Sequence, residues 1–145
     1  IEEAYALTTT EEAPKKIFID VYTDWCGWCK RMDKATFQKP EVAMYMNENF
    51  YNVKFNAEQK EDIEILGNTF KFVAQGSRGY HELAAALLNG KMSYPTVLFM
   101  NGKFEMLSPV PGYQEVTAFL KVAHFFGDDA YKSTPWTSYS YEGTK

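Results

Sequence analysis

The two cysteines of the chain lie in one short segment, Trp25-Cys26-Gly27-Trp28-Cys29-Lys30. The apolar run of residues 17–22 just before it predicts a buried strand, followed by a turn and a helix. A cysteine in the first turn of a helix is reactive, because unpaired backbone N–H groups and the helix dipole stabilise a thiolate. The spacing therefore predicts a redox pair. Cys26 would attack a disulfide, and Cys29, one helical turn later, would resolve the mixed disulfide.

A C-x-x-C pair is also half of many zinc sites, so the other potential ligands matter. Zinc usually takes four ligands, and the only histidines of the chain are His81 and His124. Neither histidine lies in a C-x-x-C or H-x-x-x-H pattern. We therefore expect no metal and no cofactor apart from the redox-active disulfide of Cys26 and Cys29.

Length and composition predict a single packed domain. The chain has 145 residues, of which 46% are apolar and 17% aromatic, which is enough for one sizeable core. The net charge of −4 and the lack of a basic stripe argue against nucleic acid as a partner. No apolar run approaches the roughly 20 residues that a membrane-spanning helix needs. We expect a monomer.

The elements that position the cysteines alternate between strands and helices. Apolar residues on both faces predict a central strand at 16–23, and the helix after the cysteine motif extends to about residue 37. The remaining apolar patterns and turn signals predict helices at 42–49, 81–88 and 113–126, a strand at 50–55, and a hairpin of 96–100 and 103–107 around Asn101-Gly102. This order predicts an α/β fold with a central mixed sheet flanked by helices.

Four motifs in this order resemble the thioredoxin superfamily. Asp20 lies six residues before the first cysteine, where the family has a buried carboxylate, and residues 25–30 resemble its W-C-G-x-C-K. Tyr94-Pro95-Thr96 resembles the segment in which a cis proline faces the dithiol, and Asn101-Gly102-Lys103 resembles the following hairpin. The resemblance covers about residues 16–126 and implies a thioredoxin fold.

The chain departs from thioredoxin itself in three places. Trp28 stands where thioredoxin has proline, and the stretch between the cysteines and Pro95 is longer than in the minimal fold. We expect residues 63–88 to be a helical insertion before the strand that follows Pro95. The tail, residues 127–145, is rich in aromatic residues and should pack back on the domain. These features resemble thioredoxin-related proteins of bacterial cell envelopes.

The resemblance implies further catalytic roles. Asp20 would accept the proton of Cys29 through water, and the alternative is a structural carboxylate that faces an edge or pairs with a lysine. A cis Pro95 would let the backbone of Tyr94 pair with a substrate peptide. The alternative is a trans Pro95 that merely begins a strand.

Aromatic residues beside the cysteines are candidates for substrate binding. Trp25, Gly27 and Trp28 would form a platform for extended substrates, together with Tyr94 and Tyr113. The alternative for each tryptophan is packing in the core.

The sequence thus predicts a thiol-disulfide oxidoreductase that reduces protein disulfides, with protein thiols and disulfides and an upstream thiol electron donor as partners. One alternative is a copper or cytochrome-assembly thiol chaperone on the same scaffold, and another is a non-catalytic binding module. The chain opens at Ile1 without Met, so a signal peptide would be hidden from view. We expect a periplasmic or otherwise extracytoplasmic protein, with the cytoplasm as the alternative.

Overall fold

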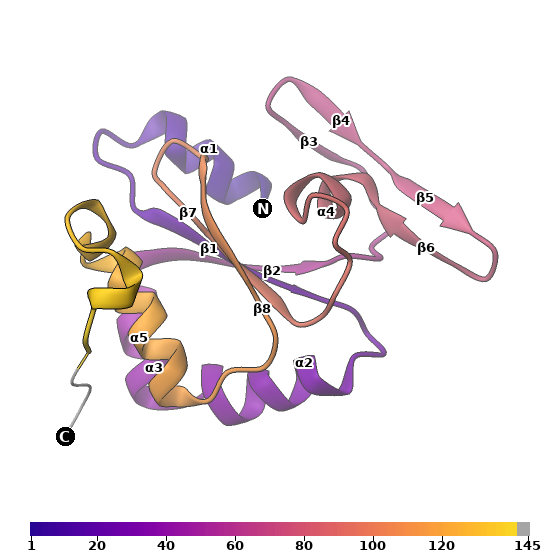
Figure 1. The fold of residues 1–145 in the computed structure, drawn as a ribbon. Helices are drawn as coiled ribbons and strands as arrows, with labels where there is room; N and C mark the ends of the chain where they lie inside the picture. The colour runs from indigo at the N-terminus through magenta and orange to yellow at the C-terminus, as the bar shows by residue number, and fades with distance from the viewer. Residues whose placement is uncertain (142–145) are drawn as a thin grey trace.

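Strand β1 (Lys16–Tyr22) runs through the middle of a four-stranded sheet in the computed structural model, which describes residues 1–141 (Figure 1). The strand order is β2-β1-β7-β8. Strand β2 (Phe50–Asn56) is parallel to β1, whereas β7 (Thr96–Met100) is antiparallel to β1 and to β8 (Met106–Pro111). The predicted mixed sheet is therefore confirmed.

Helices cover both faces of this sheet (Figure 1). They are α1 (Glu2–Thr10), α2 (Gly27–Met32) with its π-helical continuation η1 (Asp33–Phe37), α3 (Pro40–Asn49), α4 (Glu82–Leu87) and α5 (Val116–Gly127). Helices α1 and α4 pack on one face, and α2, α3 and α5 pack on the other. The four predicted helices correspond to α2 with η1, α3, α4 and α5, with ends that differ by a few residues.

The residues of β1 alternate between two hydrophobic clusters. Ile17, Ile19 and Val21 belong to the cluster under α1 and α4, while Phe18 belongs to the cluster under α2, α3 and α5. Successive side chains of a strand point to opposite faces, so Asp20 lies on the same face as Phe18. The alternation of β1 therefore directs a carboxylate toward the face that carries the cysteine helix.

The expected helical insertion at 63–88 is mostly β-structure. Two hairpins occupy its first part, β3 (Ile63–Ile65) with β4 (Asn68–Phe70) and β5 (Phe72–Gln75) with β6 (Arg78–His81), and only α4 is helical. Figure 1 shows them as a ribbon that extends beside α4. The physical reason lies in the turns: Leu66 and Gly67 both have positive φ, as a two-residue hairpin turn requires.

The hairpin after Pro95 also differs from its prediction. The connection spans 101–105 rather than Asn101-Gly102 alone, and β8 begins at Met106. The side chain of Asn101 accepts hydrogen bonds from the backbone N–H groups of Lys103 and Glu105, both at 2.9 Å. Phe104 is buried, with its ring edge-on to Tyr5, so this residue packs in the core and does not belong to a strand.

The C-terminal tail packs against the cluster under α5. Tyr139 and Tyr141 contact that cluster, and Trp136 lies edge-on to Phe125 with ring centroids 5.2 Å apart. Residues 142–145 of the predicted tail lie outside the described residues. None of the helices within 1–141 is both long and apolar enough to cross a membrane.

Candidate redox site

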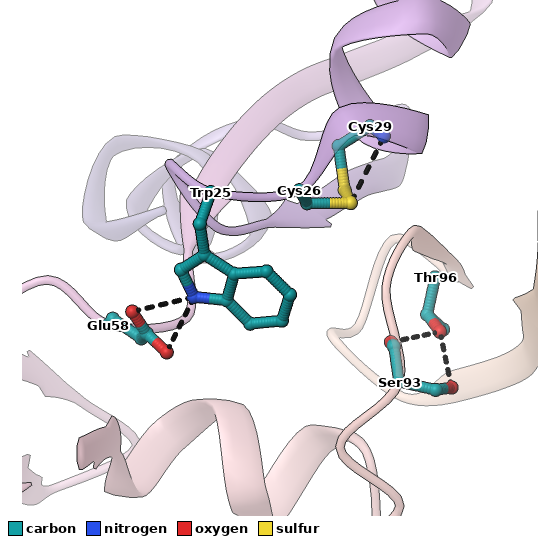
Figure 2. The surroundings of a disulfide bond; sticks show 6 residues. All are labelled: Trp25, Cys26, Cys29, Glu58, Ser93 and Thr96. Carbon is teal, nitrogen blue, oxygen red and sulfur yellow. Dashed lines mark hydrogen bonds between the residues drawn. A yellow bond between two sulfur atoms is a disulfide. The ribbon is translucent and has the colours of Figure 1, made fainter. Parts of the chain in front are cut away.

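Cys26 and Cys29 form a disulfide at the start of α2 (Figure 2). Cys26 is the residue that caps this helix, and its Sγ accepts a hydrogen bond from the backbone N–H of Cys29 at 3.1 Å. Both cysteines are largely buried, with 5% and 7% of their surface exposed. In the reduced protein, a donor aimed at Cys26 Sγ would stabilise the thiolate of Cys26 over that of Cys29.

Asp20 is a buried carboxylate behind the helix of the cysteines. Only 5% of its surface is exposed. Burial raises the pKa of Asp20 to about 6, even though the charge of Lys54 lowers it; the charge of Asp33 raises it further. An acid whose pKa lies close to neutrality can both take up and release a proton in the working pH range.

A pocket of about 260 Å³ connects Asp20 with the redox pair. Its lining includes Asp20, Thr23, Cys29 and Lys54. The hydroxyl of Thr23 is buried and has no hydrogen-bond partner among residues 1–141. Several of the residues that line the pocket are polar, and its volume is large enough for a water molecule that could join Cys29 to the carboxylate of Asp20.

Both tryptophans of the motif lie at the surface. Trp25 is 49% exposed and Trp28 is 56% exposed, so neither side chain belongs to the core. The ring of Trp25 lies edge-on to Tyr94, with centroids 5.9 Å apart, and the ring of Trp28 packs on Tyr113 at 5.3 Å. Two aromatic pairs therefore flank the disulfide, while exposed Gly27 separates Cys26 from Trp28.

The loop before β7 brings Tyr94 to the same site. The Tyr94–Pro95 peptide bond is cis, and Pro95 is buried. Thr96 Oγ1 donates a hydrogen bond to the carbonyl oxygen of Ser93 at 2.8 Å, and Figure 2 shows these two residues in the surroundings of the disulfide. A hydrogen bond within the loop thus stabilises it. The ring of Tyr94 brings the loop into contact with Trp25 of the cysteine motif.

Several residues around the motif were not predicted from the sequence, among them Glu58 and Arg78 beside Trp25. The indole Nε1 of Trp25 donates to both carboxylate oxygens of Glu58 at 3.1 Å (Figure 2), and the guanidinium of Arg78 lies over the Trp25 ring, 4.4 Å from its centroid. Glu58 follows β2 in a segment that looks like a charged surface connection. Arg78 lies in β6, a strand in the segment that was predicted to be a helical insertion. Strand alternation places Asp20 on one face of β1, but no local signal in the sequence gives its register with Lys54 of β2.

The two histidines have local partners of their own. His81 is fully buried, with Nε2 3.0 Å from the carbonyl oxygen of Glu61, and its Nδ1 accepts the backbone N–H of Leu83 at 3.2 Å. His124 Nδ1 lies 2.6 Å from a carboxylate oxygen of Asp128. Within residues 1–141, no three Cys, His, Asp or Glu side chains are grouped as a metal site would need.

Comparison with known proteins identifies relatives of this fold and motif. The model of a protein family named Thioredox_DsbH, described as "Protein of unknown function, DUF255", matches residues 2–121. The chain is 30% identical over 79 residues to spermatogenesis-associated protein 20 of Rattus norvegicus, a match over 54% of the chain and 10% of the relative. It is 34% identical over 61 residues to the thiol:disulfide interchange protein DsbD of Vibrio vulnificus, covering 41% of the chain and 10% of DsbD.

Among solved structures, a thioredoxin-fold protein from Helicobacter pylori superposes with a TM-score of 0.66 at 20% identity, covering 93% of this chain and 88% of the other. This likeness shows the fold. The chain matches only about a tenth of the length of the curated relatives.

Proposed function

This chain belongs to the Thioredox_DsbH family within the thioredoxin superfamily, and on that premise we propose that it is a thiol-disulfide oxidoreductase that reduces disulfides of other proteins. The observation that carries the proposal is the Cys26–Cys29 disulfide at the start of α2, where Cys26 Sγ already receives a backbone N–H. The exposed rings of Trp25 and Trp28, each packed against a half-buried tyrosine, supply a surface for a protein substrate.

The first step begins from the reduced protein. The Cys26 thiolate attacks one sulfur of the substrate disulfide, so a Cys26–substrate disulfide forms while the substrate S–S bond breaks. The departing substrate sulfur leaves as a thiolate and takes a proton from water. The backbone of Tyr94 beside cis Pro95 would hold the substrate peptide as an added strand.

The second step closes the internal disulfide. Cys29 loses its proton to the Asp20 carboxylate through water in the pocket that both residues line, and the Cys29 thiolate then attacks Cys26 Sγ. The Cys26–Cys29 disulfide forms, and the second substrate sulfur leaves as a thiolate. Two electrons have passed to the substrate, so a dithiol donor must reduce the chain before the next cycle.

Partners and location follow from the same proposal. The substrates are protein disulfides, the electron donor is a dithiol protein, and the chain acts as a monomer. We also propose an extracytoplasmic location such as the periplasm, because the motif and tail resemble thioredoxin-related proteins of bacterial cell envelopes.

Reduction of insulin by dithiothreitol tests the proposal. We expect the protein to accelerate precipitation of the insulin B chain, and Cys26→Ser to abolish the acceleration. A parallel assay with copper distinguishes the oxidoreductase from the thiol-chaperone alternative. The thiol chaperone would bind copper stoichiometrically and would not accelerate insulin reduction. A reduction potential near −120 mV, the value of a strong oxidant, would contradict the reducing direction.

A further inference from the structure

The chain has only two arginines, and both lie over the tryptophans of the redox motif. Of the 15 lysine and arginine residues, only Arg31 and Arg78 are arginines. The Arg78 guanidinium carbon is 4.4 Å from the ring centroid of Trp25, and that of Arg31 is 5.4 Å from the ring centroid of Trp28. Each exposed indole beside the disulfide therefore carries a guanidinium over its ring.

The two arginines come from unrelated parts of the fold. Arg31 belongs to α2, two residues after Cys29, whereas Arg78 belongs to β6 of the inserted hairpins. Both side chains are exposed, and neither takes part in an ion pair within residues 1–141. The second hairpin thus brings a positive charge to Trp25 from a segment about 50 residues away in the chain.

A guanidinium that lies over an aromatic ring is held in place and still offers N–H donors at its rim. Those donors match the geometry of a carboxylate, with which arginine forms paired hydrogen bonds. Neither guanidinium forms an ion pair with Glu58 in the described part of the chain, and the carboxylate oxygens of Glu58 accept the indole Nε1 of Trp25. The charges of Arg31 and Arg78 are therefore available to a visiting molecule.

We propose that Arg31 and Arg78 form a recognition site for acidic side chains on both sides of the disulfide cysteine in a protein substrate. The inference rests on the proposed function and deepens it by naming the substrate class. The ligand of this recognition site is an extended segment of the substrate protein that has Asp or Glu near its disulfide cysteine. Glu58 and the exposed Asp24 would disfavour an acidic residue placed directly against them, so the arginines also set the position of the segment.

Three synthetic peptides test the inference. Each carries one disulfide, flanked by Glu, Gln or Lys, and the rate constant for its reduction is measured with the fully reduced protein at low ionic strength. We expect the Glu peptide to react roughly tenfold faster than the Lys peptide, with the Gln peptide between them. In 0.5 M NaCl the ratio should fall below about twofold, because exposed charges are screened.

Variants assign the preference to the arginines. Arg31→Ala with Arg78→Ala should bring the ratio of Glu to Lys peptide rates close to one, and the two Arg→Lys replacements should keep part of it. Using the ratio within each variant cancels any general loss of activity. Lys121→Ala is the matched control, because Lys121 lies over Trp136 at 4.7 Å, outside the motif, and should leave the ratio intact.

The outcomes separate the two proposals. Failure of the wild-type protein to reduce the Gln peptide contradicts the oxidoreductase function itself. Reduction of the Gln peptide with equal rates for the Glu and Lys peptides overturns the recognition site alone. A preference that survives in the double alanine variant also overturns it.

Discussion

Asp20 and Lys54 are register partners on the parallel strands β1 and β2, yet the lysine does not keep the carboxyl acidic. Burial outweighs the lysine charge and raises the pKa of Asp20 to about 6. A strand position that would otherwise hold an apolar residue therefore carries a group that titrates near neutral pH.

Asp20→Asn should stabilise the protein at pH 7. The pKa of Asp20 is raised from 3.8 to about 6 on folding, so the folded state binds a proton that the unfolded state has lost. The associated stability is complete below pH 3.8 and is lost as pH rises through 6. We expect the unfolding free energy of the variant to exceed that of the wild type by about 3 kcal/mol at pH 7, and the gain to disappear near pH 4, measured by urea unfolding.

The same variant should slow the second chemical step. In single-turnover experiments with a preformed Cys26–substrate disulfide, the wild-type rate should rise with pH through 6, as the Asp20 carboxyl becomes able to accept a proton. Asp20→Asn should lose this inflection. An unchanged profile in the variant would remove Asp20 from the reaction and leave it a structural role.

Neighbouring charges should shift the pKa of Asp20 in opposite directions. Lys54→Gln removes the charge that lowers this pKa, so titration of the Asp20 carboxyl by NMR should give a midpoint above that of the wild type. Asp33→Asn removes a charge that raises the pKa and should lower the midpoint. Shifts of the same sign in both variants would contradict this electrostatic balance.

The two cysteines should differ in reactivity after reduction. Cys26 Sγ receives the backbone N–H of Cys29, so Cys26 is expected to hold the stable thiolate and to react first with iodoacetamide at neutral pH. Cys29→Ser should accumulate a mixed disulfide with substrate, detected by non-reducing electrophoresis and mass spectrometry. Cys26→Ser should trap none, and labelling of Cys29 before Cys26 would reverse the assignment.

His81 should be a structural residue of the insertion. Its Nδ1 caps α4 by accepting the N–H of Leu83, and its ring is fully buried against Phe55. His81→Ala should cost about 2–3 kcal/mol of unfolding free energy, through the lost cap and the cavity left behind. His81→Asn keeps a capping group and should cost less. Equal losses in both variants would show that the cap contributes nothing.

The sequence alone was sufficient for the elements that depend on local patterns. Apolar residues on both faces of 16–23 predicted β1 as a central strand, and helical spacing predicted α3 and α5, because these signals need only neighbouring residues. The C-x-x-C pair at the start of a helix also follows from local geometry. The register of Asp20 with Lys54 did not follow from local patterns, because the tertiary structure decides how two strands far apart in the sequence pair.

Long-range packing decided the rest. Residues 63–81 form two hairpins instead of a helix, and the positive φ values of Leu66 and Gly67 in the first turn are seen only in the folded structure. The sequence also contained two arginines, yet nothing local relates Arg78 to Trp25. Arg78 contacts Trp25 only because β6 folds back beside the motif. That tertiary contact therefore decides whether the positive charge of Arg78 is available to a substrate.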